Sequence, residues 1–222
     1  MRKMNKHGIL TVISGFAGSG KGTLVKFLLQ QYDYCLSISA TTREPRPGEE
    51  HGREYFFLTR KEFEDMIDKG ELIEWAEYVG NYYGTPKTYV EEQLAAGKDV
   101  ILEIEVQGAL NVKKLFPEAL LIFLTPPSAT ELRNRLVGRG TEDIITINKR
   151  MKRAIEESQC MKEYDYIAVN DKIEECVSYV HNIITKVKEN GKAQSKLLSN
   201  DQWIEKLNAE LCRLEPLTGK TD

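Results

Sequence analysis

A glycine-rich segment near the N-terminus has the residue types of a phosphate-binding loop. It lies between a short apolar run, 9–14, and a segment with helical spacing of apolar residues, 23–31, and it reads Gly15-Phe16-Ala17-Gly18-Ser19-Gly20-Lys21-Gly22-Thr23. Glycines allow successive backbone N–H groups to turn towards an anion. The helix that follows adds its unpaired N–H groups and the positive end of its dipole. Lys21 supplies a mobile cation for β- and γ-phosphates. The pattern therefore predicts a nucleoside triphosphate site; a glycine turn that only joins a strand to a helix is the alternative.

The residue after this lysine departs from the usual phosphate-loop pattern. The pattern G-x-x-x-x-G-K-[ST] has a hydroxyl there, whereas this chain has Gly22, and Thr23 follows one place later. We therefore expect no direct protein ligand for Mg²⁺ in the loop. Mg²⁺ commonly keeps several waters and binds through substrate phosphates, so water-mediated contacts from Thr23 or Glu103 are the expected arrangement.

Two arginines spaced three residues apart indicate a second anion site. Arg43 and Arg46 flank Pro45, and Pro47 follows. The prolines restrict the loop and lower the entropy cost of holding both guanidinium groups. Two arginine forks can bind a phosphate monoester with paired hydrogen bonds, so this loop is a candidate site for a phosphorylated small molecule. For either arginine alone, a solvated charged loop is the alternative.

An acid inside an apolar strand indicates how a purine could be recognised. Glu74 lies in Ile73-Glu74-Trp75, where burial is costly unless the carboxylate is paired. Guanine offers two adjacent donors, N1–H and the N2 amino group, and one carboxylate can accept from both, whereas adenine lacks this pair. A site left unpaired by the wrong base can discriminate by on the order of 10⁴. Ser39 and Thr85 could donate to guanine O6. The alternative is a surface acid on an edge strand.

Two further acids follow an apolar strand. Glu103 lies near the end of the predicted strand 100–104, and Glu105 follows it directly. Strand alternation predicts that both side chains lie on the same side of this strand. Such a pair can steer hydrated Mg²⁺ or accept hydrogen bonds from a nucleotide. An exposed strand end is the alternative.

An arginine cluster surrounds a glycine-containing turn, Gly138 to Gly140. Phosphoryl transfer demands positioning and positive charge where the transferring group spreads negative charge. A flap hinged near these glycines could deliver both on closing and exclude water, which would otherwise accept the phosphoryl group. The cluster comprises Arg133, Arg135, Arg139, Arg150 and Arg153.

The elements that must position these residues follow an α/β rhythm. Short apolar segments predict strands at 9–14, 100–104, 120–124 and 166–169. Helical periodicity predicts helices at 23–31, 106–115, 129–137, 147–162 and 173–188. Strands separated by helices indicate a parallel sheet with right-handed crossovers. Residues 36–85 differ: they predict strands at 53–58 and 72–78, a short third strand at 82–83 and a helix at 61–68, which together form a β-rich insertion. Asp201 is a candidate cap for a last amphipathic helix that reaches Leu214.

Composition excludes several classes of protein. The chain has 222 residues, 41% hydrophobic and 29% charged, with a net charge of -3. This is ordinary for a globular protein, and it provides no global basic field for nucleic acid or an anionic membrane. The four cysteines form no C-x-x-C pair, the three histidines are scattered, and the run 9–13 is too short for a signal peptide core. We therefore expect a cytoplasmic protein without nucleic-acid or membrane partners. The sequence does not distinguish a monomer from a homodimer.

Several of these motifs, taken in order, resemble one family. The order of segments is the Ser-x-Ser/Ala-Thr-Thr-Arg-x-Pro-Arg-x-Gly-Glu pattern ending at Glu49, Gly52-x-x-Tyr55, Ile73-Glu74-Trp75, Asn81-Tyr82-Tyr83-Gly84-Thr85 and Leu102-Glu103-Ile104-Glu105-Val106-Gln107-Gly108. Together with the phosphate loop and the arginine-rich flap, it is similar to guanylate kinase over about residues 8–188. The resemblance implies a P-loop nucleoside-monophosphate-kinase fold and transfer of the γ-phosphoryl group of ATP to GMP with Mg²⁺.

The resemblance also implies roles for individual residues. Contacts to the GMP phosphate fall on Arg43, Arg46, Tyr55 and Tyr83, with Glu49 in the same motif. Contacts to the base fall on Ser39, Glu74 and Thr85, with Glu103 and Glu105 beside them. Catalytic cations would be Lys21, Arg43, Arg135, Arg139 and Arg150. Asn170 resembles the adenine-side contact, although a turn-forming asparagine is an alternative. Arg133 and Arg153 are assigned to solvated helix faces.

The implied organisation is one domain with an insertion and a lid. The domain covers 8–188, with a core at 8–38 and 86–188, a GMP-binding insertion at 39–85 and a mobile lid at about 136–147; residues 189–222 form an extension of unknown role. Two other functions remain open at this point. One is a non-catalytic interaction module with the same fold, and the other is a P-loop kinase for another phosphorylated acceptor.

Overall fold

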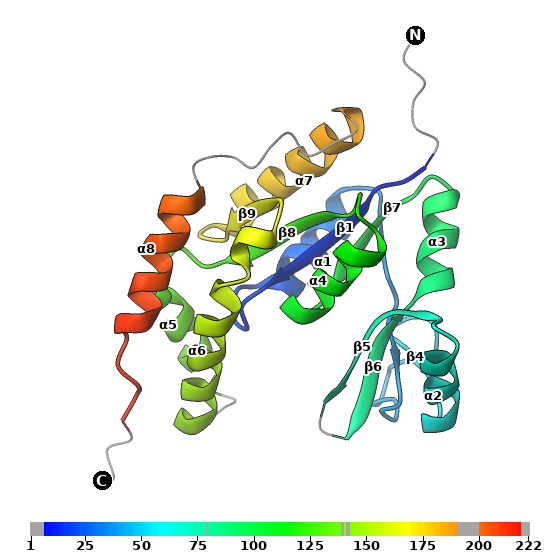
Figure 1. Cartoon of the computed structure of the whole chain (residues 1–222), viewed down its shortest axis with the longest axis horizontal. Helices are drawn as coiled ribbons and strands as arrows, with labels where there is room; N and C mark the ends of the chain where they lie inside the picture. The colour runs from blue at the N-terminus through cyan, green and yellow to red at the C-terminus, as the bar shows by residue number, and fades with distance from the viewer. Residues whose placement is uncertain (1–6, 79, 139, 141–142, 191–199, 219–222) are drawn as a thin grey trace. The chain divides into compact units, whose positions relative to one another are not determined.

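The computed structural model describes residues 7–78, 80–138, 140, 143–190 and 200–218, and Figure 1 shows its helices and strands. The chain divides into two compact units. The first unit comprises Met1–Val12 and Tyr32–Ala119, and the second comprises Ile13–Gln31 and Leu120–Asp222.

The larger sheet is the core of the fold. It has five strands in the order β2-β7-β1-β8-β9, namely β2 (Tyr34–Leu36), β7 (Asp99–Glu103), β1 (Leu10–Gly15), β8 (Leu120–Thr125) and β9 (Tyr166–Val169). β2 runs parallel to β7, and β8 runs parallel to β9. All six residues of β1 and all six of β8 are buried, as expected for strands that are covered on both faces. The α/β class with a helix-flanked parallel sheet is therefore confirmed.

A second, smaller sheet lies within the first unit. Its strand order is β4-β3-β6-β5, with β3 (Ala40–Thr41), β4 (Phe56–Phe57), β5 (Leu72–Tyr78) and β6 (Asn81–Pro86). β6 pairs antiparallel with β3 and with β5, and the hairpin of β5 and β6 is visible in Figure 1. The sheet therefore brings the loop after β3 and the strands that carry Glu74 and Thr85 into one structure.

Three helices accompany the strands of the first unit: α2 (Arg60–Asp68), α3 (Lys87–Ala95) and α4 (Val106–Leu115). Thr59 and Glu62 form a capping box at the start of α2, which satisfies backbone donors that the helix leaves unpaired. Phe63 of α2 is fully buried in a cluster with Ala40 and Leu72, and its ring stacks on Tyr82 at 5.3 Å. Helix α2 thereby packs on strand β6, which carries Tyr83 and Thr85.

The second unit is mostly helical. Helix α1 (Lys21–Gln31) packs against α7 (Ile173–Asn190), and α8 (Asn200–Arg213) packs against α5 (Ala129–Gly138) and α6 (Ile144–Ser158). A short 3₁₀ helix, η1 (Met161–Glu163), precedes β9. None of the helices in the described ranges is both long enough and apolar enough to cross a membrane.

Several element boundaries differ from those predicted. The expected strand 53–58 is reduced to β4, because residues 52–54 form a turn in which Arg53 N–H donates to the Glu50 carbonyl at 3.1 Å. Strands β2 and β3 and helix α3 were not predicted. Only Val90 of α3 is buried, so no apolar stripe marks it in the sequence.

Helix starts also differ from the prediction. Helix α1 begins at Lys21 rather than 23. Helix α6 begins at Ile144 rather than 147, because the Asp143 side chain caps it by accepting from Thr146 N–H at 2.7 Å. It ends at Ser158 rather than 162, and η1 takes over the last residues of the predicted helix. The last helix begins at Asn200, so Asp201 lies within it rather than before it.

Candidate active site: two anion-binding regions

The phosphate loop joins β1 to α1 in the second unit, as the sequence predicts. Gly15 and Gly20 have φ values of +148° and +94°, which side-chain-bearing residues rarely adopt. A Cβ on Gly15 would lie 2.0 Å from the Leu124 carbonyl oxygen, and one on Gly20 would lie 2.5 Å from Asn170 Nδ2. The loop therefore needs glycine at both positions for conformation and for space.

Lys21 begins α1 and its side chain folds over the loop. Its Nζ donates to the Gly15 carbonyl at 2.7 Å and to the Phe16 carbonyl at 3.3 Å. The hydroxyl of Ser19 is buried, and no hydrogen-bond partner is recorded for it within the described residues. An ammonium group, a buried hydroxyl and a helix N-terminus thus gather at one loop, which suits a phosphate.

Asn170 and Arg135 connect this loop to its surroundings. Asn170 follows β9 and is 6% exposed; its Nδ2 donates to the Ser19 carbonyl at 2.8 Å. This contact crosses 151 residues of sequence, so Asn170 does more than form a local turn. Arg135 Nη2 donates to the Asn170 carbonyl at 2.9 Å, and its Nε donates to Glu131 at 2.7 Å. Sequence reasoning missed Glu131, although its i,i+4 spacing from Arg135 could have indicated it.

The other arginines of the predicted flap fall into three groups. Arg150 is half-buried on α6. Arg139 and much of the predicted lid turn lie outside the described residues. Arg133 donates to the Glu215 carbonyl at 3.4 Å, and Arg153 forms an i,i+4 ion pair with Glu157 at 2.8 Å. Arg133, which was predicted to lie on a solvated helix face, thus also contacts a later part of the chain through an exposed hydrogen bond.

The arginine loop of the first unit has an internal partner. Arg43 Nη2 donates to both carboxylate oxygens of Glu49, at 3.0 and 2.9 Å. The Arg46 backbone N–H donates to the same carboxylate at 2.8 Å, while the Arg46 side chain is exposed. This backbone bond, together with Arg43, lowers the pKa of Glu49. Glu49 thus fixes Arg43, a positioning role that the motif alone did not reveal.

Aromatic rings surround the same guanidinium group. The Arg43 Cζ lies 5.6 Å from the ring centre of Tyr55 and 5.7 Å from that of Phe57, within the range of cation–π attraction. The rings of Tyr55 and Tyr83 are 6.1 Å apart. Burial is the main cause that raises the pKa of Tyr55, so its phenol stays a hydrogen-bond donor. Arg43, Tyr55 and Tyr83 therefore form one basic, donor-rich cluster.

Glu74 lies on edge strand β5, but its carboxylate is covered. The Thr85 hydroxyl, fully buried on β6, donates to Glu74 Oε1 at 2.7 Å. A Cβ on Gly108 would lie 3.0 Å from Glu74 Oε2, so the glycine in α4 leaves room for this oxygen. Burial raises the pKa of the Glu74 carboxyl, and the Thr85 bond opposes this with a smaller effect. The surface-acid alternative therefore does not describe Glu74.

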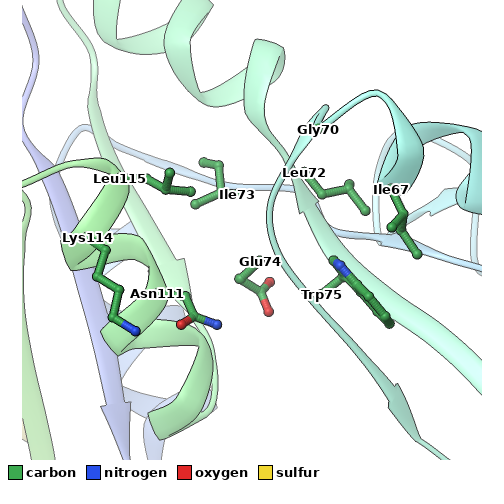
Figure 2. A pocket seen from close by; sticks show the side chains of 9 residues that line it. All are labelled: Ile67, Gly70, Leu72, Ile73, Glu74, Trp75, Asn111, Lys114 and Leu115. Atoms are coloured by element: carbon green, nitrogen blue, oxygen red, sulfur yellow. The ribbon is translucent and has the colours of Figure 1, made fainter.

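Figure 2 shows Glu74 at a pocket of about 370 Å³ in the first unit. Apolar side chains from α2 and β5 line one part, and α4 contributes polar Asn111 and Lys114. Ser39 lies just before β3 and is half-buried; its backbone carbonyl accepts from Phe56 N–H at 2.9 Å. Glu74, Thr85 and Ser39 are thus placed on neighbouring segments of one small sheet.

The acid pair after β7 is arranged differently from the prediction. Glu103 is the last residue of β7 and is exposed, and it contributes to the raised pKa of Tyr55. Glu105 lies beyond the strand, at the N-cap position of α4. Strand alternation therefore does not apply to the pair, and the placement of both acids on one side stays a prediction without that support.

The raised pKa of Glu74 predicts a pH-dependent stability. Because its folded-state pKa lies above the ordinary value of 4.5, Glu74 stabilises the fold most below pH 4.5 and this contribution is lost as pH rises through the folded-state pKa. We therefore expect the unfolding free energy of the ligand-free protein, minus that of Glu74→Gln, to fall as pH rises above 4.5. Urea titrations across this range measure it, with the exposed Glu77→Gln as the control for charge. A difference that stays constant or rises would contradict the prediction.

A parallel α/β sheet with a phosphate loop at the end of its first strand defines a phosphate-loop nucleotide-binding protein. The protein-family model described as "Guanylate kinase" matches residues 8–187. A guanylate kinase from Shouchella clausii (strain KSM-K16) is 58% identical over 179 residues, which cover 80% of this chain and 87% of that protein. A guanylate kinase from Bacillus subtilis (strain 168) is 54% identical over 183 residues, covering 82% and 90%.

A solved structure agrees with these matches. The crystal structure of guanylate kinase from Anaplasma phagocytophilum has a TM-score of 0.64 and 35% sequence identity, and the match covers 82% of this chain and 87% of that one. The chain belongs to the guanylate kinase family.

Proposed function

We propose that this chain transfers the γ-phosphoryl group of ATP to GMP and thereby forms ADP and GDP, with dGMP as a further acceptor. The observation that carries the choice of acceptor is the Glu74 carboxylate, which is covered and accepts a 2.7 Å hydrogen bond from Thr85. Since Thr85 occupies one oxygen, the carboxylate keeps acceptor capacity for the N1–H and N2 donors of guanine. AMP offers no such donor pair and would leave this carboxylate unpaired.

On the acceptor side, the basic cluster of the first unit would hold the GMP phosphate. Arg43 is pre-oriented by Glu49, and its fork suits phosphate oxygens. Arg46, Tyr55 and Tyr83 would add further donors to the phosphate, while Ser39 would donate to guanine O6. Glu103 and Glu105 follow the neighbouring strand β7 and would border the nucleotide.

On the donor side, the loop Gly15–Thr23 would enclose the ATP phosphates. Lys21 already lies over this loop, and it would exchange its loop carbonyls for phosphate oxygens. Arg135, Arg139 and Arg150 would neutralise charge on the transferring group, and Asn170, tied to the Ser19 carbonyl, would border the adenine. No general base is needed, because the attacking group is a phosphate oxygen that is already anionic.

We also propose that Mg²⁺ accompanies ATP. No group of three or more His, Cys, Asp or Glu side chains in the described ranges could hold a metal ion. Mg²⁺ usually keeps several waters and binds through substrate phosphates. The exposed hydroxyl of Thr23 and the exposed carboxylate of Glu103 would hold it through water. When bound, the ion supplies positive charge to the phosphate oxygens.

For the organisation of the chain we keep the boundaries expected from the sequence: a core at 8–38 and 86–188, a GMP-binding insertion at 39–85 and a lid at about 136–147. The second sheet, built from residues 40–86, supports the insertion. A cytoplasmic location is also proposed, supported by four cysteines that are all free thiols. The non-catalytic interaction module is not favoured, because the chain has the phosphate loop, Lys21 and the pair in which Glu49 orients Arg43.

A coupled assay of ADP release tests the proposal. The full chain is given ATP and Mg²⁺ with GMP, dGMP, AMP, UMP or CMP in turn. We expect turnover with GMP and dGMP that exceeds turnover with the other three by orders of magnitude. No turnover with any nucleotide would favour the interaction module, and a preference for another monophosphate would favour a kinase with a different acceptor.

A further inference from the structure

The last described segment, residues 200–218, packs on the second unit. Helix α8 buries Ile204, Leu207 and Leu211 and contacts α5, α6 and η1. Figure 1 shows α8 alongside α6. This segment lies beyond residue 187, where the match to the family model ends. The function described above assigns nothing to it.

A carboxylate of α8 caps helix α5. Glu210 Oε2 accepts from the backbone N–H of Ala129, the first residue of α5, at 3.3 Å. A negative charge at this end of a helix is favourable, since the first backbone N–H groups are unpaired and the dipole is positive there. Glu210 thus ties α8 to the start of the helix that carries Arg135.

The residues after α8 bind both arginine-bearing helices. Asn148 of α6 donates from Nδ2 to the Leu217 carbonyl at 2.9 Å, and its Oδ1 accepts from Leu217 N–H at 2.9 Å. On α5, Arg133 donates to the Glu215 carbonyl at 3.4 Å. The paired bonds at Asn148 fix both the position and the orientation of the tail, which a single bond would not do.

These attachment points lie close in sequence to the proposed catalytic arginines. Asn148 precedes Arg150 by two residues on α6, and Arg133 precedes Arg135 by two residues on α5. Arg135 is in turn bound to the carbonyl of Asn170, next to the phosphate loop. The tail therefore binds each helix within two residues of its arginine.

We propose that residues 200–217 form a C-terminal strap that positions helices α5 and α6 for phosphoryl transfer, with Asn148 and Glu210 as its positioning residues. This inference rests on the proposed function, because it assigns the strap to the arginines of that reaction. The strap is expected to affect phosphoryl transfer from ATP and not the binding of GMP. The residues proposed to bind GMP all lie in the first unit, whereas every strap contact named above lies in the second.

Two small changes test the strap without exposing the apolar face of α8. The first ends the chain after Arg213 and so removes Glu215 and Leu217; the second is Asn148→Ala in the full chain. We expect each to lower kcat about tenfold and to leave KM for GMP unchanged, since a misplacement of about 1 Å can cost up to about 10²-fold. Combined, the two changes should cost no more than the truncation alone, because the truncation already removes the Leu217 contact that Asn148→Ala removes.

Controls separate positioning from stability. Asn148→Asp keeps the acceptor for Leu217 N–H and should recover part of kcat, and Glu205→Gln on the exposed side of α8 should have no effect. The rates of amide hydrogen exchange in α5 and α6 should be higher in the shortened chain than in the full chain, whereas the rates in α2 should be unchanged. A variant with lower thermal stability and unchanged kcat would overturn the strap, and so would additive losses in the combined variant. Absence of GMP kinase activity in the full-length chain would instead overturn the proposed function.

Discussion

Replacing Lys21 by alanine should lower kcat for GMP phosphorylation by about 10²–10³-fold, the usual cost of removing one preorganised charge from a transition state. Lys21 Nζ lies 2.7 Å from the Gly15 carbonyl, so the ammonium is already held at the loop proposed to enclose the ATP phosphates. Alanine keeps the helical backbone of α1 while it removes the cation. Steady-state ADP release measures the loss.

The same substitution should leave the affinity for GMP unchanged. All residues proposed to bind GMP lie in the first unit, whereas Lys21 lies in the second. Calorimetric titration with GMP in the absence of ATP measures this affinity. Lys26→Ala, which removes an exposed lysine from the same helix, is the matched control and should retain full activity. A parallel loss of GMP affinity in Lys21→Ala would contradict the division into two anion-binding regions.

The parts of the site that could be predicted are those with a fixed local spacing. Loop, lysine and helix form one continuous segment, so the sequence alone places Gly15 to Thr23 between a strand and a helix. The strand at 72–78 was also predicted at the bounds that β5 has, whereas only residues 82–83 of β6 (Asn81–Pro86) were predicted. These features depend on neighbours in the sequence, and the structure has them where they were expected.

Contacts between distant segments could not be predicted. The bond from Asn170 Nδ2 to the Ser19 carbonyl spans 151 residues, and nothing in either segment alone indicates the other. The role of Glu49 was missed for a different reason: a glutamate six residues from an arginine forms an ion pair only if the loop folds back, which depends on a turn rather than on a helical or strand period. The specific ligand contacts of these residues stay predictions that the substitutions test.

The acid pair at Glu103 and Glu105 shows where a periodic rule fails. Alternation holds only inside a strand, and β7 ends at Glu103. The chain then turns into α4, whose first residues follow Glu105 directly. A strand end displaced by one residue was therefore enough to remove the basis for relating the two side chains, although the strand itself was predicted.

Glu74→Gln tests recognition of the base with the smallest change in shape. The amide oxygen can still accept from the Thr85 hydroxyl, which now donates to Oε1 at 2.7 Å. The second atom becomes an NH₂ group of similar size, so the close approach of Gly108 is tolerated. That NH₂ group is a donor and would face a donor of guanine. Losing a hydrogen bond to a charged group costs about 1.5–3 kcal/mol, which corresponds to about 10–10²-fold.

We therefore expect kcat/KM for GMP to fall by about 10²-fold in this variant, while the value for AMP stays at its low level or rises. The ratio of the two values is the decisive quantity, because a general loss of folding or of phosphoryl transfer lowers both together. Glu77→Gln makes the same chemical change on strand β5 at an exposed position, and it should leave the ratio unchanged. If the GMP/AMP ratio of Glu74→Gln equals that of the unmodified chain, Glu74 does not read the base, and the preference for guanine must come from another donor, such as the hydroxyl of Ser39.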